Sequence, residues 1–494
     1  MKRLLLLLTA LSLLPATAFC ESASRISDAT QACLSCHESV HPGIVGDWKT
    51  SRHSVVTPAE GMSVKDASRM VSAREVPEDL KNVIVGCAEC HTQNPDKHKD
   101  SFEHNGFTVH VVVSPEDCAT CHQTERAQYA ENVMAHAYGN LANNKLYGML
   151  VKSVNGTLTY AKGALTQAAP DAAANADSCF YCHGTVVEAG PLETRDTVMG
   201  EMQFPKLTGW PNQGVGRINP DGSMGSCAPC HARHGFSIAV ARKPYTCEEC
   251  HNGPDVPAYK VYATSKHGNI FASESKDWNF KAVPWTIGKD FTTPTCAACH
   301  VSQLAAEDGT VVSERTHKMT DRLSWRIFGP VYAHPQPKLP NTDIIINKDG
   351  LQLPTTLDNQ PASKFLIDAE EMKTRRETMQ AACLACHATD WVSGYWMRLD
   401  NTVEQTNATV LAATDIMQEA WRKGLAVGPG KGNPFDEYIE NVWTDAWLFS
   451  AHSVRYSSAM GGGGDYGAFA DGRINLNKHV REMKDWLDLR LSKK

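Results

Sequence analysis

Apolar residues recur at helical spacing mainly in the last quarter of the chain. From Asn401 to Trp421 they are three, four or seven residues apart, which predicts an amphipathic helix. The residues that carry this pattern are Val403, Val410, Leu411, Ile416, Met417 and Ala420. A second helix is predicted from Pro434 to about Met460, because Asn433 suits the N-cap and Pro434 the first helical position.

A third helix is predicted from Leu476 to Leu491. We therefore expect residues 388–494 to form a bundle of long helices that covers the rest of the protein and takes part in oligomerisation. Upstream, residues 301–382 are rich in loop-forming prolines, with one strand expected at Asp343–Asn347.

The first residues have the pattern of a secretory signal peptide. Met1 to Arg3 is short and basic, Leu4–Leu14 is an apolar run, and Ala16 and Ala18 supply small residues at a cleavage site. The apolar run is too short to span a bilayer, although an uncleaved membrane anchor is the alternative. Cys20 raises the possibility of a lipid anchor, but Phe19 is a poor neighbour for that processing. We expect residues 1–18 to be removed and the mature protein to be exported and soluble.

The sequence Cys-x-x-Cys-His occurs eight times and contains 16 of the 17 cysteines, leaving Cys20. The cysteine pairs are Cys33 and Cys36, Cys87 and Cys90, Cys118 and Cys121, Cys179 and Cys182, Cys227 and Cys230, Cys247 and Cys250, Cys296 and Cys299, and Cys383 and Cys386. The histidines that follow are His37, His91, His122, His183, His231, His251, His300 and His387. This motif is typical of covalent c-type haem attachment, in which both thiols bind haem and the histidine becomes the proximal iron ligand. A zinc site would need second ligand pairs and would not repeat one string, and a disulfide framework is the other alternative.

Eight haems in 494 residues leave about 62 residues for each. Porphyrin must then fill much of the core, so we expect a mainly α fold with short helices and loops around eight haems. Residues 19–387 are predicted to form the octahaem-binding domain and residues 388–494 the C-terminal helical bundle. Attachment of c-type haem to thiols indicates an oxidising compartment, in bacteria the periplasm.

The formal net charge is −7, which gives no indication of nucleic-acid binding. The acidity suits docking to a basic redox partner, or simply keeps the protein soluble. Of the 20 histidines, 12 lie outside the motifs. Electron-transfer haems carry a ligand on both faces, whereas a haem that does chemistry needs an open face. Twelve histidines are enough to cap every haem, so their number alone reveals no open site.

The chain resembles the octahaem hydroxylamine oxidoreductases over most of its mature length, most specifically in residues 179–330. The strings that carry the resemblance are His231-Ala-Arg233-His234-Gly-Phe-Ser, Arg242-Lys-Pro244, Ser265-Lys-His267-Gly, Trp278-Asn-Phe, Pro294-Thr-Cys-Ala-Ala-Cys-His300 and Thr316-His317. The neighbouring octahaem nitrite and tetrathionate reductases are less similar, because several replace one proximal histidine by lysine and no Cys-x-x-Cys-Lys occurs here.

The resemblance implies seven haems with two histidine ligands and an open fourth haem, at Cys179, Cys182 and His183. The matching distal histidines are His53, His104, His136, His234, His267, His317 and His452. His110 is the alternative to His104. The remaining spare histidines are expected to be ordinary residues: His41, His98, His110, His334 and His479.

The family also implies residues that act over the open haem. Asp255 matches its aspartate, but Val256 stands where its histidine would be, and Phe328 is closest to its pocket tyrosine. The pocket is therefore expected to have lost polar groups. The oxidising members cross-link a tyrosine from a neighbouring subunit to the catalytic haem, and Tyr466 is in register with it after four glycines. These glycines also read as a flexible link between helices.

Loss of an imidazole weakens proton removal and favours the reductive direction. The resemblance thus implies a periplasmic, trimeric enzyme that reduces nitrite and hydroxylamine to ammonium. It would be fed by a cytochrome c or a quinol-linked membrane protein, with His183, Asp255 and Tyr466 at the catalytic haem. Oxidation of hydroxylamine or hydrazine by a cross-linked haem, a non-catalytic electron conduit, and other substrates such as sulfur oxyanions are the alternatives.

Overall fold

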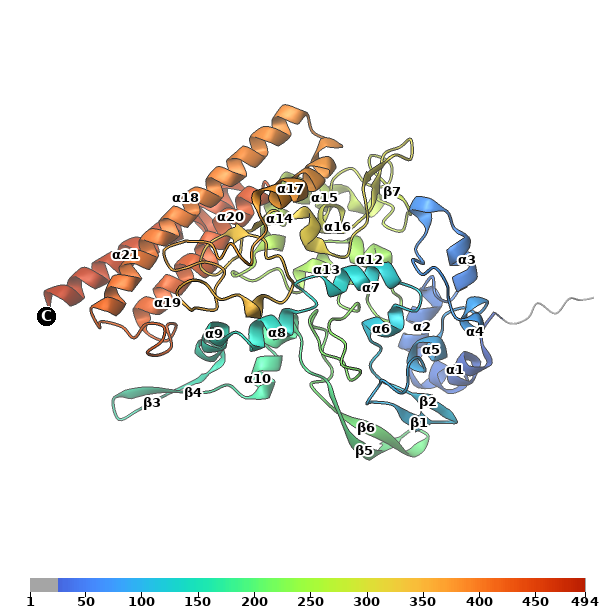
Figure 1. Cartoon of the computed structure of the whole chain (residues 1–494). Coiled ribbons are helices and arrows are strands. Elements are labelled where there is room, and N and C mark those ends of the chain that lie inside the picture. Colours follow the sequence, from blue (N-terminus) through green and yellow to red (C-terminus); the bar gives the residue numbers. More distant parts are fainter. Residues whose placement is uncertain (1–24, 494) are drawn as a thin grey trace, which may run out of the picture.

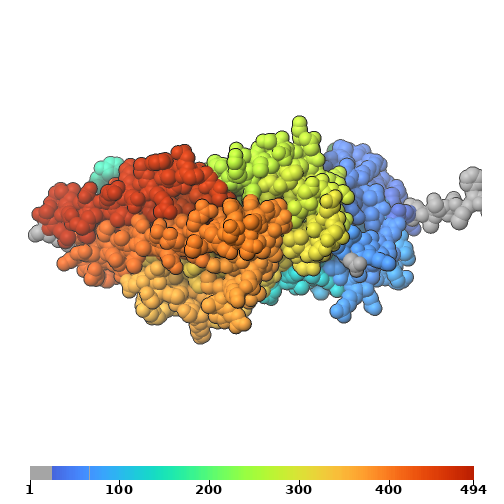
Figure 2. All heavy atoms as spheres, turned by 90° about the horizontal axis from the view of Figure 1, so that it is seen from above, coloured from blue at the N-terminus to red at the C-terminus, as the bar shows by residue number. Residues whose placement is uncertain are grey.

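Short helices and loops make up one end of the protein, and long helices form the other end (Figure 1). The computed structural model describes residues 25–493, so the predicted signal peptide and Cys20 lie outside the described residues. Seen from above, the molecule is elongated, with the N-terminal and C-terminal parts at opposite ends (Figure 2). Within residues 25–493, no helix has both the length and the apolar character needed to cross a membrane.

Most helices before residue 301 are only one to three turns long. They are α1 (Asp28–Val40), α2 (Pro42–Thr50), α3 (Pro58–Ser63), α4 (Glu78–Lys81), α5 (Cys87–His91), α6 (Pro115–Cys118), α7 (Gln123–Ala130), α8 (Ala137–Ala142), α9 (Lys145–Asn155), α10 (Ala172–Ala176), α11 (Cys179–His183), α12 (Ile238–Arg242), α13 (Tyr245–Glu248), α14 (Ala258–Thr264), α15 (Lys266–Glu274) and α16 (Cys296–His300). Three of them, α5, α11 and α16, coincide with Cys-x-x-Cys-His motifs. Residues at positions i, i+3 and i+4 share one face of a helical turn, so both cysteines and the histidine point the same way.

The strands form small sheets, mostly two-stranded and antiparallel. The hairpins are β1 (Phe102–His104) with β2 (Phe107–Val109), β3 (Thr157–Ala161) with β4 (Ala164–Ala168), and β5 (Glu188–Thr197) with β6 (Gly200–Thr208). β7 (Trp285–Thr286), β8 (Leu304–Ala305) and β9 (Val311–Ser313) form a three-stranded sheet, and β10 (Trp325–Arg326) pairs with β11 (His334–Pro335). The pairs β3–β4 and β5–β6 project away from the body (Figure 1).

Residues 301–368 are mainly loop, as the prolines predicted, but the strand expected at Asp343–Asn347 is wrong. Thr342–Ile344 forms a 3₁₀ turn instead. The Asn347 side chain organises a turn by accepting hydrogen bonds from the backbone N–H groups of Asp349 (2.9 Å) and Leu351 (3.1 Å). The alternation of apolar and polar residues at positions 343–347 therefore belongs to a half-buried loop. The other short 3₁₀ turns are η1 (Asp66–Ser68), η2 (Ser275–Asp277) and η3 (Met319–Arg322).

The helical elements that follow are α17 (Ala369–Leu384), α18 (Thr389–Arg422), α19 (Tyr438–Thr444), the π-helical segment η5 (Asp445–Ser450), α20 (Ala451–Ala459), the π-helical segment η6 (Tyr466–Ala470) and α21 (Arg473–Ser492). The three predicted helices are present with shifted starts: the first is α18, the second is α19 to α20, and the third is α21. The helix start expected at Pro434 is wrong: Asn433 Oδ1 accepts the Phe435 backbone N–H (3.1 Å) but caps only a turn, while its amide donates to Met149 O (3.3 Å) and Ser153 Oγ (2.8 Å) of α9. The helix starts at Tyr438, and the Glu437 backbone N–H is accepted by Glu440 Oε2 (3.2 Å).

The apolar core of this bundle lies between α18, α19, η5 and α21. Its fully buried members include Val410, Met417, Ile439 and Met483. Asn407 of α18 joins the bundle to the preceding loops by bonding both backbone groups of Ala333, at 3.0 and 2.9 Å. The mainly α class with a C-terminal long-helix bundle is thus confirmed. The division at residue 387 stays a prediction.

Glu440 makes the bundle sensitive to pH. It is buried, and Trp421 donates its indole N–H to it at 2.8 Å. Burial raises the pKa of Glu440 to about 7. The folded state therefore holds a proton on Glu440 that the unfolded chain releases near pH 4.5, so stability falls as pH rises through this interval.

We expect the apparent midpoint of thermal unfolding to fall between about pH 5 and pH 8, and Glu440→Gln to remove part of that fall, by about 2 °C or more. Scanning calorimetry of both proteins across this range is the measurement. Glu404→Gln, at an exposed position of α18, is the matched control. Parallel pH profiles for wild type and Glu440→Gln would contradict this account.

Candidate functional site

One cavity of about 3500 Å³ runs through the N-terminal part, and the cysteines and histidines of all eight motifs line it. A site for a single small ligand usually occupies about 300–1000 Å³, so this interior has room for several cofactors. Its walls consist of the short helices and loops described above, together with parts of α17, α18, η5 and α20. The space between the motifs is thus not filled by side chains, which agrees with the expectation that haem supplies the core.

Motif histidines face a second histidine across this cavity in five places. The facing pairs and the distances between ring centroids are His37–His104 (6.1 Å), His122–His53 (6.2 Å), His91–His234 (6.5 Å), His231–His317 (6.4 Å) and His387–His267 (6.2 Å). An iron about 2 Å from a nitrogen of each ring separates two imidazole centroids by about 6 Å. The residues present therefore fit haems with two histidine ligands at these five motifs. His104, and not His110, lies opposite His37; the His110 ring instead lies 6.0 Å from His91, which also faces His234.

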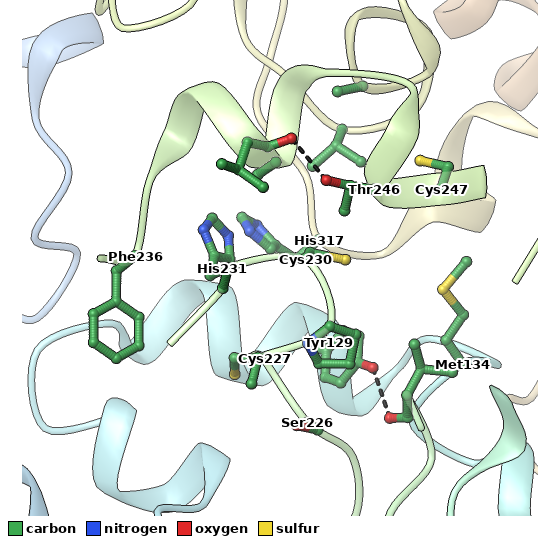
Figure 3. A pocket seen from close by; sticks show the side chains of 18 of the residues that line it. Tyr129, Met134, Ser226, Cys227, Cys230, His231, Phe236, Thr246, Cys247 and His317 are labelled. Carbon is green, nitrogen blue, oxygen red and sulfur yellow. Dashed lines mark hydrogen bonds between the residues drawn. The ribbon is translucent and has the colours of Figure 1, made fainter. Parts of the chain in front are cut away.

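Figure 3 shows one such pair, with His231 and His317 next to each other and Cys227 and Cys230 of the same motif nearby. Tyr129 lies below them and donates its hydroxyl hydrogen to Val215 O at 2.8 Å. Burial lowers the pKa of His231 and His317 to about 4. Both imidazoles are therefore neutral at physiological pH, and the neutral form is the one that binds iron.

Backbone carbonyls orient several motif histidines. His91 Nδ1 lies 2.8 Å from His110 O, and His183 Nδ1 lies 3.1 Å from Ala137 O. A hydrogen bond at Nδ1 fixes the tautomer and leaves Nε2 for a metal. The local fold thus presents these rings in the form required of an iron ligand.

Thiol contacts between motifs show which motifs are neighbours. In four pairs the thiol of one motif shifts the pKa of the thiol of another: Cys33 with Cys87, Cys118 with Cys227, Cys182 with Cys250, and Cys247 with Cys296. Burial raises the pKa of Cys90, Cys230 and Cys299 to about 12, and Cys121, Cys247 and Cys383 respectively add to these shifts. The motifs therefore follow one another in the order first, second, third, fifth, sixth, seventh and eighth, and the fourth adjoins the sixth.

Two predicted distal histidines, His136 and His452, do not line the cavity wall. His136 Nε2 lies 2.9 Å from Ala130 O. His452, buried on α20, has Nδ1 2.6 Å from Asp255 O, and its Nε2 has no hydrogen-bond partner among the described residues. This leaves His452 Nε2 in the state expected of a ligand. Both assignments stay predictions, and among the described residues no second imidazole makes a ring contact with His183, His251 or His300.

The fourth motif lies among charged and aromatic residues. Burial lowers the pKa of His183, while the nearby Asp255 raises it and Arg326 lowers it. Asp255, Arg326 and Tyr456 line the same cavity. The structure therefore brings together His183 and Asp255, as predicted.

Three polar residues that sequence reasoning missed, Arg326, Tyr147 and Tyr456, also line the cavity, while the expected loss of polar groups at Val256 and Phe328 stays a prediction. Arg326 lies with its guanidinium carbon 4.7 Å from the centre of the Phe328 ring. The fully buried nitrogen Nη1 of Arg326 has no hydrogen-bond partner among the described residues. Arg326 faces His334 across β10 and β11. His334, expected to be ordinary, has Nδ1 2.6 Å from Pro335 O and an unpartnered, buried Nε2.

These residues belong to segments that carry no motif. The only local signal in the sequence was an arginine and a histidine in a proline-rich stretch that is otherwise typical of a loop.

Tyr466, the third predicted catalytic residue, does not line the cavity of its own chain. Its hydroxyl donates to Asp471 Oδ2 at 3.2 Å, within the turn that precedes α21. Burial and Asp471 raise its pKa to about 12. Its predicted role stays a prediction about a neighbouring subunit.

The repeated motifs and the paired imidazoles define a multihaem cytochrome c. Two family models match the chain: "Seven times multi-haem cytochrome CxxCH" at residues 221–331, and "Cytochrome c554 and c-prime" at residues 32–112. A solved structure titled "Hypothetical multiheme protein" is 40% identical, with a TM-score of 0.89, covering 95% of this chain and 97% of that one.

Two proteins of Kuenenia stuttgartiensis are also similar. A probable nitrite reductase-hydroxylamine oxidoreductase fusion protein is 24% identical over 428 residues, which are 81% of this chain. The match spans only 39% of that relative's length. A chain of the reducing HAO-like protein complex has the same fold, with a TM-score of 0.60 and 18% identity, covering 94% of this chain and 86% of that one. The chain belongs to the multihaem cytochromes c, and it is similar to proteins of the hydroxylamine oxidoreductase-like group.

Removing the ligand opposite His37 tests the pairing. His104→Ala should add one high-spin ferric haem per chain, because the iron at the first motif loses its second imidazole. Electron paramagnetic resonance of the oxidised protein measures this change. His110→Ala is the matched control and should leave the spin states of all haems unchanged. A new high-spin signal in His110→Ala and none in His104→Ala would reverse the assignment.

Proposed function

We infer that this protein carries eight c-type haems and reduces nitrite, and with it hydroxylamine, to ammonium at the site of His183. The names of its relatives support nitrogen chemistry, since one is a probable nitrite reductase-hydroxylamine oxidoreductase fusion and another belongs to a reducing HAO-like complex. Eight Cys-x-x-Cys-His motifs around one cavity support the number of haems.

The observation that carries the reductive direction is Arg326. A buried guanidinium nitrogen without a partner is costly, unless an anion that enters the cavity completes its hydrogen bonds. Arginine binds planar oxyanions through two parallel hydrogen bonds. Nitrite is a planar anion with two oxygens, whereas hydroxylamine and hydrazine are not anions at neutral pH. The site is therefore suited to an anionic, oxidised nitrogen substrate.

Neighbouring side chains supply orientation and protons. Burial raises the pKa of Tyr147, and it raises the pKa of Tyr456 far above its ordinary value, so both phenols stay protonated and can donate hydrogen bonds. Asp255 is exposed to the cavity and is the carboxylate placed to pass protons to the substrate. When bound, the haem at this motif supplies electrons and an open iron position for the substrate nitrogen.

The order of the motifs supports an entry path for electrons. The fourth motif adjoins the sixth, and the sixth lies within the series that links the first motif to the eighth. Haems held at these motifs would connect either end of the series to the site of His183. We propose that a cytochrome c or a quinol-linked membrane protein in the periplasm is the donor, and that the exported enzyme forms a homotrimer.

Arg326→Gln tests substrate binding. We expect kcat/KM for nitrite reduction to fall about 10- to 100-fold, mainly through KM, because a charge-assisted pair is lost. The corresponding value for hydroxylamine should change much less. Arg326→Lys retains the charge without the fork and should recover part of the activity. Steady-state kinetics with a reduced dye as electron donor measure kcat/KM for nitrite and for hydroxylamine in wild type and in both variants.

Asp255→Asn distinguishes proton delivery from binding in the same assay, since it should lower kcat for both substrates about 100-fold with KM little changed. Equal losses for nitrite and hydroxylamine in Arg326→Gln, together with shifted haem potentials, would assign Arg326 to a haem propionate instead. Unchanged turnover in Asp255→Asn would remove Asp255 from the mechanism.

The mass of the denatured, purified protein tests the haem number and the role of Tyr466 together. We expect one chain with eight haem increments, because Tyr466 is hydrogen-bonded within its own chain. Tyr466→Phe should then leave the denatured mass pattern unchanged apart from the lost oxygen. A covalent trimer that disappears in Tyr466→Phe would favour hydroxylamine or hydrazine oxidation. Spectra with low-spin haems only would favour an electron conduit.

A further inference from the structure

A second group of metal-ligating side chains lies between the second and third motifs. His98 follows α5, His110 follows β2, and Asp117 belongs to α6. Their ligand atoms all lie within 4.8 Å of one another. The exposed fractions are 3% for His98, 1% for His110 and 7% for Asp117. The three residues therefore form a compact polar group in a buried place.

We propose that His98, His110 and Asp117 bind a divalent transition-metal ion, Zn²⁺, in addition to the haem iron. Asp117 Oδ2 lies 3.2 Å from His98 Nε2 and 3.6 Å from His110 Nε2. Ligand atoms about 2.0–2.2 Å from a tetrahedral zinc are separated by about 3.3–3.6 Å. Because the two rings are stacked and nearly parallel, one ring must turn before both Nε2 atoms point at the same ion. Imidazole nitrogen together with carboxylate oxygen favours zinc over magnesium or calcium.

His110 points independently to a ligand. Both of its ring nitrogens are buried: Nε2 has only the long 3.6 Å contact with Asp117 Oδ2, and Nδ1 has no hydrogen-bond partner among the described residues. A buried imidazole without a partner is costly, and a metal bond at Nε2 removes that cost. Hydrogen bonds inside the protein therefore do not explain this side chain.

The surrounding residues have the arrangement of an outer ligand shell. His98 Nδ1 lies 3.3 Å from Asp100 Oδ1, and Asp100 Oδ2 accepts the backbone N–H groups of Val111 (3.0 Å) and Val112 (2.8 Å). A carboxylate behind a histidine fixes the ring and strengthens its bond to a metal. Asp117 is held in turn by the Asn94 amide (3.0 Å) and the Ser114 N–H (2.8 Å).

Charge leads to the same conclusion. Asp100, Asp117 and Asp221 surround two imidazoles, and within residues 25–493 their ion pairs are with His98 and His110 only. Asp221 Oδ2 lies 4.0 Å from His98 Nε2, close enough to become the fourth ligand after a small shift. A divalent cation balances these carboxylates at the point where they meet.

The same histidines are poorly placed to be axial haem ligands. The rings of His98 and His110 are stacked, with centroids 3.6 Å apart and planes 4° from parallel, so no porphyrin fits between them. His104 faces His37, and the ring of His91 lies 6.5 Å from His234 and 6.0 Å from His110. The metal site therefore adjoins the second motif, where the backbone carbonyl of His110 also orients His91.

The experiment measures metals in the purified haem-loaded full chain by inductively coupled plasma mass spectrometry, with iron as the internal reference. After dialysis against a chelator and supply of zinc, wild type should contain one zinc per chain. His110→Ala and Asp117→Asn should lose at least about 90% of it, and Asp100→Asn should weaken binding about 10- to 100-fold. His479→Ala, a histidine outside the cluster, should retain it. Only variants with the wild-type ratio of haem to protein are compared, so a misfolded variant is not counted.

X-ray absorption at the zinc edge identifies the ligands. The expected result is nitrogen and oxygen at about 2.0–2.2 Å without sulfur. Sulfur at about 2.3 Å would show zinc on motif thiols that lack haem, and would overturn the proposal. Wild type with less than about 0.1 zinc per chain would also overturn it and would leave a protonated His98 among carboxylates as the explanation. Equal zinc in wild type and His110→Ala would overturn it as well.

Discussion

The distance between facing imidazoles is the constraint on which this protein depends. Five histidine pairs keep their ring centroids 6.1–6.5 Å apart without filling the space between them, so backbone on both sides of the cavity must hold each ring in place. Short helices hold the motif histidines in place with few residues, because one turn presents two cysteines and a histidine on one face. The fold around the cavity is therefore a set of ligand-bearing turns whose common core is the cofactors.

The C-terminal bundle provides what this cofactor region lacks, namely a conventional apolar core. α18 and α21 pack through Val410, Met417 and Met483, independently of any motif. α20 reaches from the bundle to the cavity and carries Tyr456 on the same helix as His452 and the buried Arg455. Arg455 Nη2 donates to Asn407 Oδ1 at 2.7 Å, and this contact ties the helix to α18. The site of His183 thus has one wall whose position is set by helix packing.

Repeats and periodicity predicted much of this structure because each has a local physical cause. Motif spelling predicted the proximal ligands, and the spacing of apolar residues predicted α18 and α21. The start of α19 was missed because Asn433 caps only a turn and its amide bonds to α9, while Glu437 and Glu440 begin the helix. The strand expected at Asp343–Asn347 failed for a similar reason, since half-buried alternation also suits a loop packed on a neighbour. Family resemblance supplied His104, and the structure now places that residue opposite His37.

A local sequence pattern does not reveal residues whose role depends on which side chains the fold places next to them, or on a missing hydrogen-bond partner. Arg326 and His334 face each other across two very short strands, and each keeps a buried nitrogen without a hydrogen-bond partner among the described residues. The same holds for His110 beside Asp117, far from that site. Packing brings such groups together at positions separated in sequence, and burial makes an unpartnered nitrogen costly. Each of these places is therefore where a ligand from outside the polypeptide is most strongly favoured: an anion at Arg326 and a cation at His110.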